Sequence, residues 1–197
     1  MSPPILHRGD VLLRPLTVED APALFAAHGD ARTHQFWSSP AHHSVAETAR
    51  YIADTLAMPG AHVWAIVDTS GGAPIYDTPH TQDEEDRAAP DDEAPLHAAL
   101  GRIALFVQRD GVGEIGIILS PDAQGRGLAS TALALVEEHG FGALDLHRIA
   151  ADVDPDNAAS LALFERAGYQ REGLLRGNWL THLGQRDSVI LGKVRAG

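Results

Sequence analysis

A glycine-rich turn is the segment of this sequence whose residue types most directly indicate chemistry. Gly125 and Gly127 flank Arg126 between an apolar run that ends at Leu119 and a helical pattern that begins at Leu128. Peptide N–H groups at the start of a helix have no partner within it, and the helix dipole adds positive potential, so such turns bind anions such as phosphate. A tight structural connection is the alternative, since a Walker ending and the dinucleotide spacing are both missing.

Glu114 could take part in proton transfer, and two further polar residues could form hydrogen bonds at a site or within a helix. Glu114 lies in the largely apolar run 113–119, where burial would raise its pKa and make it a proton acceptor near neutral pH. An outward side chain paired to a cation on a neighbouring strand is the alternative. Asn157 suits the N-cap of a short helix, and Ser160 can donate one hydrogen bond, either to a reactant or locally.

Hydrophobic periodicity predicts strands and helices in an α/β order with a mixed sheet. A turn at residues 109–111 suits a hairpin, and Ser44 with Glu47 forms a capping box. A glycine cap at Gly140 would end the helix that follows the glycine-rich turn. We expect strands at 11–16, 62–67, 102–107, 113–119, 147–153, 169–175 and 187–194, and helices at 17–27, 44–56, 128–140 and 158–167.

The negative charge of the chain is concentrated in one segment. The 197 residues carry a net charge of −12. Residues 69–98 hold eight acidic residues against one arginine, a net charge of −7 that leaves −5 for the rest, and they contain four prolines. We expect one domain, residues 1–197, with an acidic loop insertion at 69–98. The insertion is either a solvated loop without a role or an electrostatic guide for a cationic acceptor.

Composition excludes several function classes. The chain has no cysteine, which rules out a disulfide framework, a thiolate zinc site and a cysteine nucleophile. No stretch approaches the roughly 18 apolar residues of a membrane span, and the first residues lack the core of a secretory signal, so we expect a cytoplasmic protein without a membrane partner. Its acidity disfavours nucleic acid as a partner. The eleven histidines show no paired spacing typical of a metal site, so no metal is expected.

The glycine-rich turn resembles the acetyl-CoA signature of the GNAT N-acetyltransferases. The family pattern Gln/Arg-x-x-Gly-x-Gly/Ala is similar to the stretch Gln124-Gly125-Arg126-Gly127-Leu128-Ala129. The family's second block is similar to Asn157-Ala158-Ala159-Ser160 followed by Gly168-Tyr169. Segments at 13–21, 172–176 and 187–191 resemble the branch that contains the ribosomal-protein alanine N-acetyltransferases. The resemblance spans nearly the whole chain and departs at the acidic insertion.

This resemblance implies a single α/β (α+β) domain, with a twisted, mostly antiparallel mixed sheet flanked by helices. Two central strands, at 115–119 and 148–153, would splay apart and receive the pantetheine arm of acetyl-CoA between them. A backbone N–H near Leu119 would face the thioester oxygen. The implied cofactor-binding residues are Ile117, Ile118, Leu119, Gln124, Gly125, Arg126, Gly127, Leu128, Ala129, Ser130, Asn157 and Phe164.

The implied reaction is acetyl transfer from acetyl-CoA to a primary amine, which attacks directly in a ternary complex. Glu114 would take the amine proton. Ser160 would protonate the leaving thiolate, since Phe164 occupies the position at which several family members carry a tyrosine. Phe36 and Trp37 would wall the acceptor pocket, with core contacts as the alternative.

A protein N-terminal α-amine is the acceptor that we expect. Its pKa of about 7.7–8.0 lies far below the value of about 10.4 for lysine, so it is easier to deprotonate. Acetylation of a small amine, such as a polyamine, an amino sugar or an antibiotic, stays open. So do a non-catalytic acyl-CoA-binding module and assembly as a homodimer.

Overall fold

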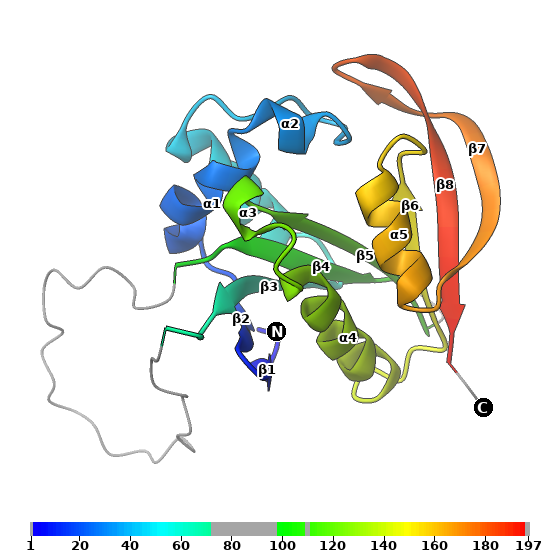
Figure 1. Ribbon diagram of the computed structural model, residues 1–197, viewed down its shortest axis with the longest axis horizontal. Helices are drawn as coiled ribbons and strands as arrows, with labels where there is room; N and C mark the ends of the chain where they lie inside the picture. The colour runs from blue at the N-terminus through cyan, green and yellow to red at the C-terminus, as the bar shows by residue number, and fades with distance from the viewer. Residues whose placement is uncertain (1, 72–97, 109–110, 196–197) are drawn as a thin grey trace, which may run out of the picture.

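One eight-stranded sheet forms the centre of the protein. The computed structural model describes residues 2–71, 98–108 and 111–195. Its strands are β1 (Leu6–Arg8), β2 (Val11–Pro15), β3 (Ala61–Asp68), β4 (Gly101–Val107), β5 (Val112–Leu119), β6 (Arg148–Val153), β7 (Gln170–Thr181) and β8 (Gly184–Val194). Within the described residues they follow the order β1-β2-β3-β4-β5-β6-β8-β7, and all neighbours are antiparallel except β5 and β6 (Figure 1). The expected mixed, mostly antiparallel sheet is confirmed.

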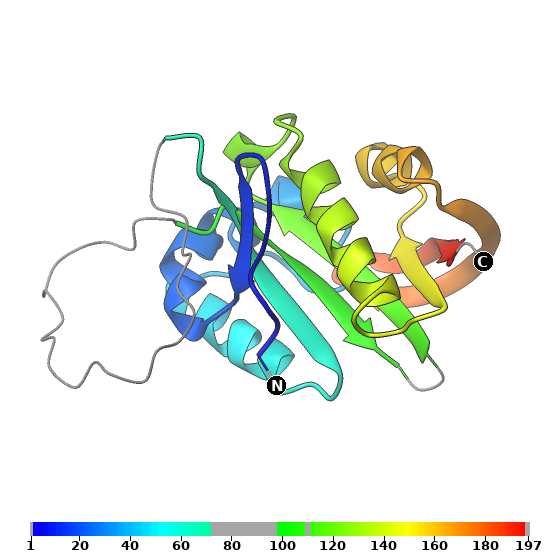
Figure 2. The same ribbon diagram turned by 90° about the horizontal axis from the view of Figure 1, so that it is seen from below.

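Helices cover both faces of this sheet. The core beneath α4 (Leu128–Phe141) and α5 (Ala158–Arg166) lies on one face, and the core beneath α1 (Ala21–His28) and α3 (Val45–Leu56) lies on the other (Figure 2). The short helix α2 (Ala31–His34) follows α1. Two 3-10 turns, at Val18–Asp20 and Pro121–Ala123, precede α1 and α4.

Alternation along β3 explains how one sheet supports two cores. Trp64 and Ile66 pack in the core that includes α4 and α5. Val63 and Ala65 pack in the core that includes α1 and α3. Successive side chains of a strand point to opposite faces, so a continuous apolar run is what a strand buried on both sides requires.

Capping fixes where the first helices begin. In the 3-10 turn that leads into α1, the Asp20 carboxylate accepts a hydrogen bond from the Thr17 N–H at 3.0 Å. At α3 the Ser44 hydroxyl accepts the Glu47 N–H at 3.2 Å, as the capping box predicts. The Glu47 carboxylate reaches one residue further back than expected, to the His43 N–H at 2.7 Å. These contacts satisfy amide groups that have no partner inside the helix.

Three local expectations need correction. The helix α4 does not end at Gly140, because Gly142 is its C-terminal cap. Gly140 instead packs against the sheet, where a Cβ would approach Ile149 Cδ1 to 3.0 Å. The elements β1 and α2 are additional to those expected, since three or four residues are too short to show a hydrophobic period. The strand β7 extends past residue 175 to Thr181, because it pairs with β8 although its side chains are mostly exposed.

The acidic insertion connects two antiparallel neighbours, since β3 ends at Asp68 and β4 begins at Gly101. Most of this insertion, residues 72–97, lies outside the described residues, as do residues 109–110 of the expected hairpin turn. The strands β4 and β5 on either side of that turn do pair antiparallel. Over the part of the chain that the structure describes, no helix combines the length and the apolarity needed to cross a membrane.

Candidate functional site

The glycine-rich turn forms an open cradle of backbone amides. Gly125 and Gly127 adopt φ angles of +74° and +79°, in the left-handed region that favours glycine. A Cβ at either position would meet no atom of the described residues within 4 Å. The Thr131 N–H donates to the Gly127 carbonyl at 3.2 Å, so the amides of residues 128–130 precede the first intrahelical bond of α4. The open space at the two glycines leaves room for an anion beside these amides.

A groove of about 890 Å³ adjoins this cradle. The end of β5, the start of α4, the helix α5 and the segment around α2 contribute to its walls. Most of the residues that the resemblance assigns to the cofactor meet here. Those that line the groove are Ile117, Ile118, Leu119, Gln124, Gly125, Gly127, Leu128, Ala129, Ser130 and Asn157.

Arg126 and Phe164 are the two predicted cofactor residues that are not part of the groove lining. The Arg126 guanidinium forms an ion pair with Asp68 at the end of β3. Phe164 is 2% exposed and packs edge-on against Tyr169, with ring centroids 5.0 Å apart. Phe164 is therefore a core residue, and it lines a second cavity next to the groove.

This second cavity, of about 270 Å³, shares part of its lining with the groove. The residues common to both are Phe36, Trp37, Ile117, Asn157 and Ser160. We call this shared lining the junction. The predicted acceptor wall and the predicted acid thus come together at one point, although they lie more than a hundred residues apart in the sequence.

The junction lies where β5 and β6 diverge. These strands pair only between Val112–Glu114 and Arg148–Ala150, and β5 continues to Leu119 against β4 alone. This confirms the expected splay. The Ser120 N–H donates to the Leu100 carbonyl on the β4 side at 2.8 Å. Because successive amides of a strand alternate in direction, the N–H of Leu119 points away from β4, toward the opening.

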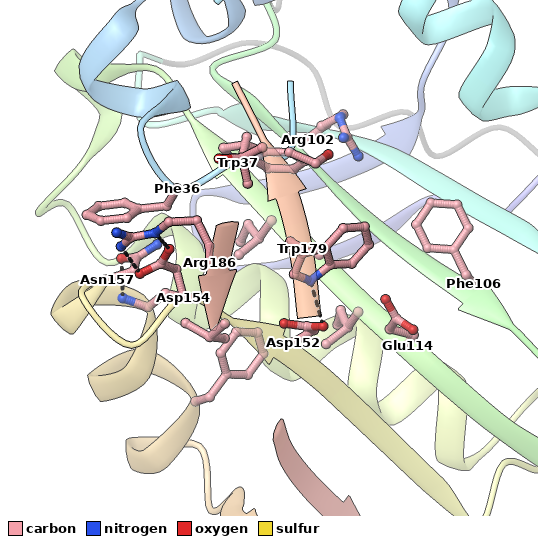
Figure 3. Close-up of a pocket in the computed structure, with 18 of the residues that line it drawn as sticks. Phe36, Trp37, Arg102, Phe106, Glu114, Asp152, Asp154, Asn157, Trp179 and Arg186 are labelled. Atoms are coloured by element: carbon pink, nitrogen blue, oxygen red, sulfur yellow. Dashed lines mark hydrogen bonds and ion pairs between the residues drawn. The ribbon is translucent and has the colours of Figure 1, made fainter. Parts of the chain in front are cut away.

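Glu114 lines the second cavity, at the last position where β5 pairs with β6 (Figure 3). It pairs with Ala150, so Asp152, two residues further along β6, lies on the same face of the sheet. Burial raises the pKa of the Glu114 carboxyl, and the negative charge of Asp152 raises it further. The Gln108 amide donates to Glu114 at 3.2 Å and opposes this shift. The net effect favours proton uptake by Glu114.

Several charged or aromatic residues of this cavity escape the sequence reasoning. Trp179 Nε1 donates to the Asp152 carboxylate at 2.9 Å, and Arg186 pairs with Asp154 at 2.8 Å (Figure 3). Arg102 is only 2% exposed, and an arginine inside an apolar strand is a signal that the sequence does offer. Trp179 and Arg186 give no such signal, because they come from β7 and β8 and reach the cavity only through the fold.

Asn157 fixes the position of Ser160. The Asn157 Oδ1 accepts the Ser160 N–H at 3.1 Å and so caps α5, which is the structural role that the sequence suggests. The capped turn holds Ser160 at the junction between groove and cavity. Its hydroxyl can donate a single hydrogen bond to a group bound there.

Comparison with known proteins identifies relatives of this chain. The family profile described as Acetyltransferase (GNAT) domain matches residues 10–170. The uncharacterized N-acetyltransferase YoaA of Bacillus subtilis (strain 168) is 30% identical over 176 residues, which cover 88% of this chain and 86% of the relative.

Two further relatives match over shorter regions. The uncharacterized N-acetyltransferase p20 of Bacillus licheniformis is 42% identical over 69 residues, 35% of this chain and 39% of the relative. The spermidine N(1)-acetyltransferase of Escherichia coli (strain K12) is 32% identical over 76 residues, 39% of this chain and 41% of the relative. Each of these matches spans less than half of the relative's length.

Solved structures share the fold at low identity. A GNAT-family acetyltransferase from Bacillus anthracis superposes with a TM-score of 0.76 at 17% identity, over 97% of this chain and 98% of that one. The spermidine N-acetyltransferase from Vibrio cholerae, in complex with CoA and spermine, gives 0.71 at 17% identity, over 95% and 96%. Mycobacterium smegmatis RimJ, in complex with CoA-disulfide, gives 0.72 at 21% identity, over 98% and 90%.

Proposed function

This chain belongs to the GNAT acetyltransferase family, and from that membership we propose that it transfers an acetyl group from acetyl-CoA to a protein N-terminal α-amine. The observation that carries the proposal is the junction, where an open groove beside an amide cradle meets a cavity that contains Glu114. Two substrates that must react need two adjoining sites with one shared boundary.

The groove suits the thioester substrate. The amides of residues 125–130 would hold the diphosphate, since they combine unpartnered N–H groups with the positive end of the α4 dipole. The pantetheine arm would take the place beside β5 that β6 leaves, and hydrogen-bond to the free backbone of residues 115–119. Acetyl-CoA supplies the activated acetyl group. The outward N–H of Leu119 would stabilise the oxygen of that group as it gains negative charge.

Glu114 is the proposed general base. An α-amine is largely protonated near neutral pH and must lose a proton before its nitrogen can attack. A carboxyl whose pKa is raised by burial accepts a proton more readily at this pH than an exposed one. A new C–N bond then forms and the C–S bond breaks. Glu114 holds the proton that the amine loses before attack, directly or through a water molecule, and the second proton, which the nitrogen loses as the amide forms, replaces the one that the departing sulfur takes up.

Ser160 is the proposed proton donor to the departing sulfur. Its position at the junction is what supports this role. Phe164 cannot donate a proton, so the serine hydroxyl is the candidate on α5. Because a CoA thiol is already a tolerable leaving group near neutral pH, the contribution of Ser160 to the rate would be modest. Phe36 and Trp37, which belong to the junction, would enclose the acceptor chain.

The experiment that tests this proposal compares free and blocked acceptors. The purified chain is incubated with acetyl-CoA and a panel of peptides that differ in their first residue, and free CoA thiol and acetylated product are measured. We expect CoA release with free peptide N-termini and none with the same peptides already acetylated at the N-terminus. CoA binding without turnover on any acceptor would instead identify a non-catalytic acyl-CoA-binding module.

A polyamine is the second candidate acceptor. Glu114 and Asp152 place two carboxylates in the acceptor cavity, which would attract a small molecule with several amino groups. A relative of this chain is named a spermidine N(1)-acetyltransferase. Adding spermidine to the acceptor panel separates the two proposals, because the acetylated product is then a polyamine. A cytoplasmic location and a homodimer remain predictions.

A further inference from the structure

Three buried histidines meet behind the wall of the acceptor cavity. His28 at the end of α1, His34 at the end of α2 and His42 before α3 are 0%, 1% and 6% exposed. One ring nitrogen of each lies within 4.8 Å of those of the other two. Imidazole is the commonest metal ligand among side chains, and three histidines are a known ligand set for zinc.

We propose that His28, His34 and His42 bind one divalent transition-metal ion of the zinc class. His28 Nδ1 and His34 Nε2 are 3.1 Å apart. Two nitrogens on a tetrahedral zinc ion lie about 3.3 Å apart, a separation that follows from Zn–N distances of about 2.0–2.1 Å. One pair of ligand atoms therefore already has the required spacing. The His42 ring stacks on His28 with an interplanar angle of 8°, so it has to turn for its lone pair to point at the same ion.

Outer hydrogen bonds orient two of the rings. The His34 Nδ1–H donates to the Ser39 carbonyl at 3.1 Å, which leaves Nε2 as the unprotonated nitrogen. The Thr48 hydroxyl donates to the Ser44 carbonyl, so it accepts from His42 Nδ1–H at 2.9 Å and leaves the His42 Nε2 unprotonated as well. Metal-binding histidines characteristically use the second ring nitrogen in this way.

His28 is the ring whose tautomer the surrounding protein does not fix. Among the described residues its buried Nε2 has no hydrogen-bond partner. With the proton on Nδ1, the ring donates to His34 Nε2. With the proton on Nε2, two lone pairs face each other across 3.1 Å and repel unless a cation lies between them. The ring can therefore serve either the metal-free or the metal-bound state.

The donor atoms of the cluster favour a particular class of metal. Burial lowers the pKa of all three rings, and the charge of Arg102 lowers it further. The side chains of Trp37 and Tyr51 pack against His28, and among the residues that the structure describes no carboxylate belongs to the cluster. An all-nitrogen donor set disfavours Mg²⁺ and Ca²⁺, which prefer oxygen, and favours Zn²⁺, Ni²⁺ or Cu²⁺.

A bound ion would connect the metal site to the acceptor cavity. Trp37 stacks on His34 with ring centroids 5.9 Å apart, and Arg102 lies over the Trp37 ring at 5.3 Å. Trp37 and Arg102 both line the acceptor cavity. Fixing the three histidines would hold together α1, α2 and the segment before α3, and so position this wall.

Metal binding to the full chain tests the proposal directly. The chain is prepared without a histidine tag, stripped with a chelator and titrated with Zn²⁺ by calorimetry, with Mg²⁺ and Ca²⁺ as separate arms. We expect one zinc ion per chain, a zinc-dependent rise in the unfolding temperature, and no binding of the other two ions. Substitution of Co²⁺ should give the visible absorption of a tetrahedral nitrogen-ligated ion.

Histidine variants show whether the cluster holds the ion. The His34→Gln and His42→Asn variants should lose zinc affinity by more than the roughly 10- to 100-fold that an outer-sphere change costs. The exposed neighbour His43→Gln is the matched control and should keep wild-type affinity. Absence of stoichiometric zinc binding and of a cobalt spectrum in the wild-type chain overturns the proposal, whether or not the variants fold. Equal binding by folded His34 and His42 variants also overturns it.

Discussion

At the scale of single residues, the position of Glu114 decides what the acceptor cavity can do. Glu114 lies at the last position where β5 pairs with β6. Asp152 is beside it on the same face of the sheet, and the opening between the two strands begins next to Glu114. The same burial that makes its charged form less favourable makes it a better proton acceptor. The role of this carboxyl as base can therefore be tested through its titration.

Replacing Glu114 by glutamine should remove the base and keep the shape of the side chain. We expect kcat to fall by roughly 10²- to 10⁴-fold, the usual contribution of a general base. In the wild type, kcat should fall as pH drops through the raised pKa of Glu114, because the protonated carboxyl cannot accept a proton. In Glu114→Gln the midpoint should move up toward the pKa of the amine, about 7.7–8.0.

The measurement is kcat at saturating acceptor between about pH 5 and 9, together with CoA binding by calorimetry. CoA affinity should be unchanged, because Glu114 lines the acceptor cavity and is not part of the groove lining. An unaltered rate and an unaltered pH profile would remove Glu114 from the role of base.

Replacing Asp152 by asparagine should move the same titration in the opposite direction. Asp152 raises the pKa of Glu114 through its negative charge, so a neutral amide lets that pKa fall. The acidic limb of kcat should then shift to lower pH. The asparagine oxygen can still accept the Trp179 N–H that Asp152 accepts. If the acidic limb of the kcat profile stays in place or moves to higher pH, Glu114 does not control the fall of kcat at low pH.

At the scale of elements, the turn between β5 and α4 does two things with one conformation. Positive φ angles at Gly125 and Gly127 turn the chain sharply enough to start α4 beside the end of β5. The same turn also lines the groove, beside the amides that precede the first intrahelical bond of α4. The sharp turn and the access to the amides both depend on the absence of a side chain. A glycine that forms a turn away from the groove therefore separates the two.

Gly127→Ala and Gly9→Ala provide this comparison. Gly9 forms the turn between β1 and β2 with φ of +54°, and, as at Gly127, a Cβ there would meet no atom of the described residues within 4 Å. Each alanine should cost about 1–2 kcal/mol of unfolding free energy from left-handed strain. Only Gly127→Ala should weaken CoA binding, by roughly 10- to 100-fold if one charge-assisted hydrogen bond is lost. Equal CoA affinity in both variants would contradict the amide cradle.

At the scale of the whole molecule, local sequence signals and the family resemblance predict the fold and the groove better than they predict the lining of the acceptor cavity. The strands, the turn at Gly125–Gly127 and the cap at Asn157 are encoded by neighbouring residues, so sequence reasoning finds them. The parallel pair β5–β6 and its divergence follow from the family resemblance. These features account for the fold and for the groove.

The rest of the candidate site depends on contacts between distant segments. Trp179 reaches Asp152 across the sheet, and the histidines 28, 34 and 42 meet from three separate segments. No fixed spacing in the sequence marks such groups, which is why a search for paired histidines on one helix predicts no metal site. Arg102 is the exception, because a charged residue in an apolar strand already indicates a special environment.

The acidic insertion is the feature whose effect belongs to the molecule as a whole. It carries −7 of the net charge of −12, and an acceptor with positive charge would be drawn toward it. Replacing residues 72–97 by a short glycine-serine linker should raise KM for a cationic peptide and reduce the effect of salt on KM, while kcat stays the same. Kinetics at two ionic strengths check this, with a neutral peptide as control. An unchanged KM for the cationic peptide would mean that the insertion does not guide acceptors.

A crystal structure of the chain with acetyl-CoA tests the central claim most directly. The account predicts diphosphate oxygens within about 2.7–3.2 Å of amide nitrogens between Gly125 and Ser130, with the acetyl group at the junction on the Glu114 side. A diphosphate bound elsewhere, or an acetyl group that lies away from the acceptor cavity, would contradict it.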